Sequence, residues 1–281
     1  MRRSVLRLCL LLALVVPVRH ASAQAPVHRY ARDRHGAEPE LPDANALLAH
    51  VRAQMPRERV ALNGRLLSKQ KTGHMDLRLN VEVVLEWGLS EPRARYTIRN
   101  SAGGKIQELA LRVGADGKPV CALESAGKQA SRALHALDQT IQGTDMTWLD
   151  LSLAFLWASE AKTEGVDSVK GRPCFVLALP YPPWLPDGET PRAGHDGSGG
   201  ILDTRGTLRL WVDRKLLMLL RAEEYDPDGT LLRRLSVKSV RKFGETWAVK
   251  DLEVKSYPSR HRTLLRVDHV YVVGTQPAGA P

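Results

Sequence analysis

One serine of the chain stands in a glycine-rich motif that could belong to a serine hydrolase. The segment Asp196-Gly197-Ser198-Gly199-Gly200 matches G-x-S-x-G except at the first glycine, where the chain has aspartate. The nucleophile of that motif needs a sharp turn between a strand and a helix. Residues 181–205 are instead rich in proline, glycine and aspartate, which is typical of an exposed loop. We therefore do not expect a nucleophilic serine here.

The histidines and cysteines also lack the spacings that metal or redox chemistry requires. The sequence has no His-Glu-x-x-His segment, and Cys121 and Cys174 form no Cys-x-x-Cys motif. Asp145 and Asp150 flank the start of a predicted helix, where helix capping explains them. The sequence thus predicts no catalytic residue, no metal and no cofactor, and we expect that the protein is not an enzyme.

Two cysteines would remain after removal of the first 23 residues. Cys121 and Cys174 both fall in predicted strands, and an oxidising compartment would permit one disulfide. Sequence alone cannot place them within the roughly 4.4–6.8 Å between Cα atoms that a disulfide requires. We expect two half-buried thiols that are not bridged.

Residues 1–23 have the features of a cleavable export signal. Arg2, Arg3 and Arg7 precede an uninterrupted apolar run from Leu8 to Val16, and Ala21-Ser22-Ala23 has the small-x-small form of a cleavage site. The run is shorter than the roughly 17 apolar residues of a membrane helix. Cleavage would remove four arginines and no acid, so the formal net charge would fall from +10 to about +6. The remaining basic residues are interspersed with acids, which does not predict nucleic-acid binding.

The elements of the chain are mainly strands. From Met75 to Trp87 every odd position is apolar, which is the period-2 pattern of one strand about 44 Å long. Similar segments separated by turn residues run from 59 to 124 and from 166 to 273. We expect a helix after Asp43, another over residues 130–141 and a third over residues 148–158, where Thr147 and Asp150 form a capping box.

This layout predicts a single domain. Short antiparallel strands with few helices favour a barrel or a wrapped sheet over residues 42–275. Residues 24–41 are polar and are expected to be a disordered lead-in, residues 181–205 an inserted loop and residues 276–281 a tail.

Several segments of the second half share their order and spacing with a known family. They are Gly143–Leu151 (GTDMTWLDL), Val166–Leu179 (VDSVKGRPCFVLAL), Leu210–Asp213 (LWVD), Glu224–Gly229 (EYDPDG) and the closing strands from Trp247 to Val273. With these segments the chain resembles the outer-membrane lipoprotein-sorting proteins, the LolA/LolB-like family of periplasmic carriers. The first half is similar in layout, and the resemblance covers about 230 residues. The long 181–205 loop and the lack of a lipobox depart from parts of that family.

The resemblance implies a mainly β fold, a half-open antiparallel β-barrel whose helices cover an apolar cavity. It implies a non-catalytic, monomeric carrier in the periplasm that binds lipoprotein acyl chains or phospholipid. An inner-membrane transporter and an outer-membrane receptor would be its partners. The side chains expected to line the cavity are apolar residues of the strands and of the third helix, namely Leu77, Leu79, Val81, Val83, Leu85, Trp148, Leu151, Phe155, Leu210, Leu235, Val237, Leu265 and Val267.

Two alternatives stay open at this point. The same apolar residues could form a tightly packed core, in which each fully buried side chain contributes about 1.5–3 kcal/mol and no cavity remains. The protein could also be an envelope sensor or scaffold module on the same fold, which would act through protein–protein contacts. The cargo and the direction of transfer do not follow from the sequence.

Overall fold

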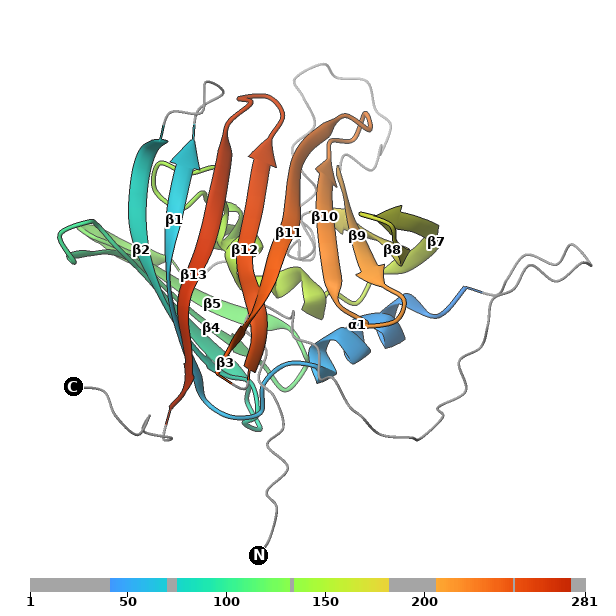
Figure 1. The fold of residues 1–281 in the computed structure, drawn as a ribbon, viewed down its shortest axis with the longest axis horizontal. Coiled ribbons are helices and arrows are strands. Elements are labelled where there is room, and N and C mark those ends of the chain that lie inside the picture. The colour runs from blue at the N-terminus through green and yellow to red at the C-terminus, as the bar shows by residue number, and fades with distance from the viewer. Residues whose placement is uncertain (1–40, 70–74, 132–133, 182–205, 245, 274–281) are drawn as a thin grey trace, which may run out of the picture.

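The computed structural model describes residues 41–69, 75–131, 134–181, 206–244 and 246–273. Its strands form one antiparallel sheet of 13 strands that curls around a few short helices (Figure 1). The strands are β1 (Val60–Lys69), β2 (Met75–Glu86), β3 (Arg93–Arg99), β4 (Lys105–Val113), β5 (Pro119–Ser125), β6 (Lys128–Ser131), β7 (Lys162–Val169), β8 (Arg172–Tyr181), β9 (Gly206–Asp213), β10 (Leu219–Tyr225), β11 (Leu231–Phe243), β12 (Thr246–Ser256) and β13 (Arg262–Val272). The helical segments are α1 (Ala44–Ala53), η1 (Leu134–Asp138), α2 (Trp148–Ser152) and η2 (Ala154–Trp157).

The order of the strands consists of two meanders placed side by side. It runs β6-β5-β4-β3-β2-β1-β13-β12-β11-β10-β9-β8-β7. Every two described strands that are neighbours in the sheet are therefore consecutive in the chain, except β1 and β13. Strands β6 and β7 are the two outer edges of this sheet, although they follow each other in the chain. The connection between them therefore has to cross the curled sheet. Figure 1 shows its helical segments inside the curl.

The alternation predicted from Met75 onward is confirmed in β2. Leu79, Val81, Val83 and Leu85 are buried, while Val84 between them is only partly buried. Because side chains alternate across a strand, Val84 points to the outer face together with the charged residues. The remaining predicted strands are also present, and β7 begins four residues earlier than the pattern indicated.

A bulge in β1 lets the first and last strands approach each other closely. The register between β1 and β13 shifts between Asn63 and Gly64. A Cβ atom on Gly64 would lie 2.6 Å from the carbonyl oxygen of Arg266, closer than van der Waals contact allows. Glycine is therefore required here because the two backbones touch, and bulges of this kind bend a strand and increase its twist.

The three predicted helices differ in how well they match the structure. The first is present as α1, where the Asp43 carboxylate accepts a hydrogen bond of 2.7 Å from the Ala46 N–H. The predicted helix over residues 130–141 is wrong. Residues 128–131 pair with β5 as the edge strand β6, and only the 3₁₀ segment η1 follows.

The predicted helix over residues 148–158 begins as expected but is not continuous. Thr147 and Asp150 form the predicted capping box at the start of α2. Leu153 then adopts a left-handed conformation with φ of 52°, which ends α2 and starts the 3₁₀ segment η2. A leucine rarely adopts positive φ, so the bend is imposed by the path of the chain across the sheet.

Several expectations concern residues outside the described part of the chain. The signal segment 1–23, the lead-in up to residue 40, residues 182–205 with Ser198, and the tail 276–281 all lie outside it. In the part that is described, no helix is both long and apolar enough to span a membrane.

Candidate functional site

The thirteen apolar residues predicted to line a cavity are brought together on the inner side of the sheet. Twelve of them are buried, and Leu77 is partly buried against the same cluster. Trp148, Leu151 and Phe155 come from the crossing connection and the others from the strands. The structure thus joins both layers into one continuous apolar interior.

Sequence reasoning missed part of this interior. Strands β3 to β5 and helix α1 also contribute buried side chains to it, namely Tyr96, Leu109, Leu111, Leu123, Leu47, Leu48 and Val51. The alternation of Leu109 and Leu111 was a readable signal, because residues two apart share a face of a strand. The spacing of Leu47, Leu48 and Val51 does place them on one face of the helix predicted after Asp43, although they are not in the predicted lining set.

A cluster of charged and polar groups joins the crossing connection to the sheet. Arg233 of β11 lies 3.0 Å from a carboxylate oxygen of Asp150 in α2 and 2.6 Å from one of Glu224 in β10. Its guanidinium also donates to the Tyr181 hydroxyl at 3.3 Å, and that hydroxyl donates to Asp138 at 3.1 Å. The guanidinium of β11 therefore contacts β8, β10 and α2 directly, and Tyr181 links η1 to the same cluster.

Burial governs the protonation behaviour of this cluster. The side chains of Arg233, Asp150 and Glu224 are only 16, 12 and 13 % exposed. Loss of solvation raises the pKa of Glu224 above its ordinary value, although Arg233 opposes this effect. Burial lowers the pKa of Arg233, but Asp150 and Glu224 outweigh it, so the net direction is upward and the guanidinium stays charged.

The same connection carries a buried donor that has no partner. Trp148 is fully buried, and within the described structure its indole Nε1 makes no hydrogen bond. A buried N–H without an acceptor costs about 1–3 kcal/mol relative to one that is satisfied. The interior therefore offers one unused donor among apolar side chains.

A shallow groove lies where α1 approaches the turn between β2 and β3. Its volume is about 380 Å³, and Trp87 and Trp157 line it with ring centroids 5.0 Å apart. Arg52 of α1 donates to the backbone carbonyl of Leu156 just before Trp157, which links α1 to η2. The groove is thus bordered by aromatic rings at the edge of the apolar interior.

Residues that bind metal ions do not cluster in the described part of the chain. No three His, Cys, Asp or Glu side chains come close enough there to hold a metal ion. Cys121 and Cys174 are buried thiols that are not joined in a disulfide, as predicted, although they are more deeply buried than expected. Burial raises the pKa of both thiols to about 11, which keeps them protonated and unreactive near neutral pH.

Comparison with known proteins gives one family match and several structural matches. A family model described as "-like: Uncharacterized protein" matches residues 206–275. No curated protein matches the sequence. A DUF1329 family protein from Desulfovibrio piger has a similar structure, with a TM-score of 0.60 at 14% identity over 83% of this chain and 93% of its own.

Two further solved structures are similar at the same level of identity. A domain described as an outer membrane lipoprotein-sorting protein, from Vibrio parahaemolyticus, has a TM-score of 0.58 at 14% identity over 82% of this chain and 93% of its own. A LolA superfamily protein from Nitrosomonas europaea has a TM-score of 0.57 at 14% identity over 84% of this chain and 96% of its own. The predicted mainly β, unclosed antiparallel fold is confirmed by this likeness and by the sheet itself.

Proposed function

The fold of this chain is LolA-like, and from that premise we propose that the protein is a non-catalytic carrier of the acyl chains of lipoproteins or other lipids. Cargo would lie between the curled sheet and the helical segments that cross it. The domain layout predicted from the sequence, with a cleaved export signal before residue 24, belongs to this proposal and gives the periplasm as the place of action.

The observation that carries the proposal is the path of the chain between β6 and β7. Because these strands are opposite edges of the sheet, the connection covers the apolar inner face as a lid attached at both ends. The lid consists of short segments interrupted at Leu153, and such segments separate from a sheet more easily than one long helix does. Each acyl CH₂ moved from water into this interior would contribute about 0.8 kcal/mol.

Trp148 supports a cargo that has a polar group next to its chain. Its buried Nε1 has no acceptor among the described residues, and an ester or amide carbonyl is an acceptor of the required type. Lipoprotein acyl chains and phospholipids both have such carbonyls at the head of the chain. Free hydrocarbon does not, and would leave the donor unsatisfied.

In the proposal the Arg233 cluster attaches the lid to the sheet in the closed state. It joins α2 and η1 to β8, β10 and β11 through contacts of 2.6–3.3 Å. The groove beside Trp87 and Trp157 lies between α1 and the β2–β3 turn. We assign the groove as the entrance for the chain. The partners in the proposal are an inner-membrane transporter that delivers cargo and an outer-membrane receptor that accepts it.

The test measures cargo and stability on the same protein. Lipid extracted from the purified mature protein is identified by mass spectrometry, and binding of a fluorescent fatty-acyl ester is measured beside thermal melting. Leu151→Glu introduces a carboxylate at a buried position of α2, within the lid. Val240→Glu introduces one in β11 at a position where the valine is 44 % exposed. We expect loss of probe binding for Leu151→Glu with a melting point within a few degrees of wild type, and no change for Val240→Glu.

Other outcomes would contradict the proposal. Global unfolding of Leu151→Glu together with a wild type that binds no probe would indicate a packed core. A wild-type protein that contains no lipid and binds no probe, but captures another envelope protein, would indicate the sensor or scaffold module. Trp148→Phe adds a further readout, because it should weaken binding of an acyl ester more than binding of the matching alkane.

A further inference from the structure

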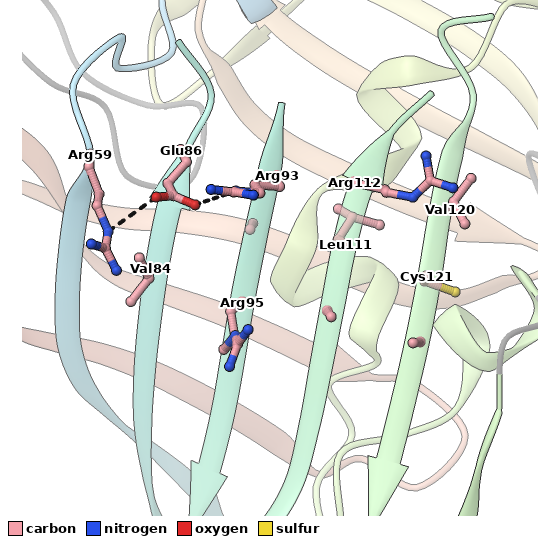
Figure 2. A pocket seen from close by; sticks show the side chains of 12 residues that line it. Arg59, Val84, Glu86, Arg93, Arg95, Leu111, Arg112, Val120 and Cys121 are labelled. Atoms are coloured by element: carbon pink, nitrogen blue, oxygen red, sulfur yellow. Dashed lines mark hydrogen bonds and ion pairs between the residues drawn. The ribbon is translucent and has the colours of Figure 1, made fainter. Parts of the chain in front are cut away.

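A second hollow lies on the opposite, outer face of the sheet, across β2 to β5. Its volume is about 880 Å³, and no residue of the predicted acyl-chain set lines it. Figure 2 shows four arginines along it, Arg59, Arg93, Arg95 and Arg112, with Glu86 between the first two. The proposed carrier function uses the inner face of these strands, so this hollow has no role in it.

The register of the strands places these side chains in two rows. In the first row Glu86 of β2 pairs with Arg93 of β3, and Arg93 pairs with Arg112 of β4. In the second row Val84, Arg95 and Ala110 pair in the same order. Directly paired residues on one face have their Cβ atoms about 4.5–5.5 Å apart. The guanidinium groups therefore stand over a common patch.

The charges in this patch are not balanced. Glu86 is the carboxylate that lines the hollow, and it is shared by Arg59 at 3.2 Å and Arg93 at 2.5 Å. Among the described residues, Arg95 has a single ion-pair contact, 3.7 Å from Glu108 in the adjacent row. Within the part of the chain that the structure describes, Arg112 has no ion pair or hydrogen bond. Four cations thus face one lining carboxylate, with side chains of Arg59, Arg93 and Arg95 that are 54, 60 and 65 % exposed.

The pairing of Arg93 with Arg112 is unfavourable without a ligand. Like charges directly opposite each other on two strands repel, and nothing in the packing requires an arginine at either exposed position. The floor beside this pair is made of small side chains, Ala110 and Ala122 in the row of Arg95, next to Val84 and Val120. Small side chains leave the space above the floor open, so an anion could be surrounded by the guanidinium forks.

We propose that this hollow is a binding site for a phosphate group. Arginine presents planar pairs of N–H donors that match the oxygens of phosphate, and a phosphate can accept from several guanidinium groups at once. A dianionic phosphate would leave the four arginines and Glu86 close to neutral together. The inner faces of the same strands hold Leu85 and Leu111, so phosphate and acyl chains would bind on opposite sides of one sheet.

The experiment measures binding of inorganic phosphate and pyrophosphate by calorimetry at low ionic strength, and binding of phosphatidylglycerol vesicles by sedimentation, with phosphatidylcholine vesicles as reference. The test variant is Arg93→Gln/Arg112→Gln. The control is Arg78→Gln/Arg241→Gln, which removes two exposed arginines that do not line the hollow. We expect the wild type to bind the phosphate probe. The test variant should bind it at least tenfold more weakly than the wild type, and the control should bind within twofold of the wild type. The melting points of both variants should be unchanged.

The two arms separate the sources of the phosphate. Binding of soluble phosphate or pyrophosphate without vesicle binding identifies a soluble phosphorylated ligand, and vesicle binding that needs phosphatidylglycerol identifies a lipid headgroup. The inference is overturned if neither probe binds, if both double variants lose binding equally, or if an acidic peptide binds more tightly than either phosphate probe. None of these outcomes depends on acyl-chain binding, so the carrier proposal stands or fails separately.

Discussion

Replacement of Arg233 by methionine tests how the lid is attached to the sheet. Methionine keeps most of the volume of the side chain but removes the cation that faces Asp150 and Glu224. All three side chains are less than one-fifth exposed, so solvent would compensate only weakly. Loss of one partner from a buried ion pair costs about 3–5 kcal/mol. For a chain of this size that corresponds to a decrease of the melting temperature of roughly 6–20 °C.

The loss should depend on pH in a defined direction. Burial already holds the pKa of Glu224 above its ordinary value, and removal of the guanidinium raises it further. A carboxyl group whose pKa is higher in the folded than in the unfolded state favours folding while it is protonated. That contribution is complete below the unfolded pKa and is lost as the pH rises through the folded pKa. The difference between Arg233→Met and wild type should therefore be larger at pH 7.5 than at pH 5.

The measurement is urea unfolding of wild type and variant at the two pH values. Arg99→Met is the matched control, because Arg99 also forms a close ion pair, 2.9 Å from Glu82, but with side chains 34 and 45 % exposed. An exposed pair of this kind contributes less than about 1 kcal/mol. A loss below about 1 kcal/mol for Arg233→Met at pH 7.5, or a loss of the same size at both pH values, would refute the reasoning.

Three further predictions concern single positions. Gly64→Ala should destabilise the protein by about 1–3 kcal/mol in urea unfolding, because its Cβ would press on the backbone of β13. Asp43→Ala should lose about 1 kcal/mol by the same measurement, because α1 loses its N-cap. Cys121 and Cys174, with pKa values of about 11, should react with a thiol reagent at pH 8 about 100-fold more slowly than in the unfolded chain.

Each of these predictions has a clear contrary result. Gly165 has open space where a Cβ would lie, so Gly165→Ala should be close to neutral, and equal losses at positions 64 and 165 would contradict the steric argument. An Asp228→Ala variant that loses as much as Asp43→Ala would show a general charge effect rather than capping. Rapid, stoichiometric labelling of the native thiols would contradict their burial.

The strands could be predicted because their signal is local. Alternation in β2 depends on adjacent residues, and a turn depends on a few neighbouring residues such as Gly117, whose φ of 76° suits glycine. The prediction of a helix over residues 130–141 was wrong because it considered only the local spacing of apolar residues. In the structure residues 128–131 form backbone hydrogen bonds with β5 instead. The bend at Leu153 carries no sequence signal, since leucine has no preference for positive φ.

The site was predictable to the extent that it is apolar. The interior followed from hydrophobic periodicity, which fixes the face of each strand. The Arg233 cluster could not be derived in this way, because its members come from five elements and form no sequence motif. From the sequence Asp150 is predicted to be a capping residue, and the structure confirms this. Its ion pair with Arg233 depends on the three-dimensional arrangement of α2, β10 and β11. The rows of arginines also depend on register.

The junction of β1 with β13 has a consequence for how the chain reaches its native state. Apart from β8 and β9, which residues 182–205 separate in the chain, the other described neighbours in the sheet are joined by short connections and can pair early, as local hairpins. The junction instead brings together segments about 200 positions apart, whose closure entropy must be overcome before any contact there is gained. Folding should therefore proceed as two independent meanders followed by a slow association of their first and last strands. During that interval both unpaired strand edges are exposed, so the chain is most prone to aggregation just before this step.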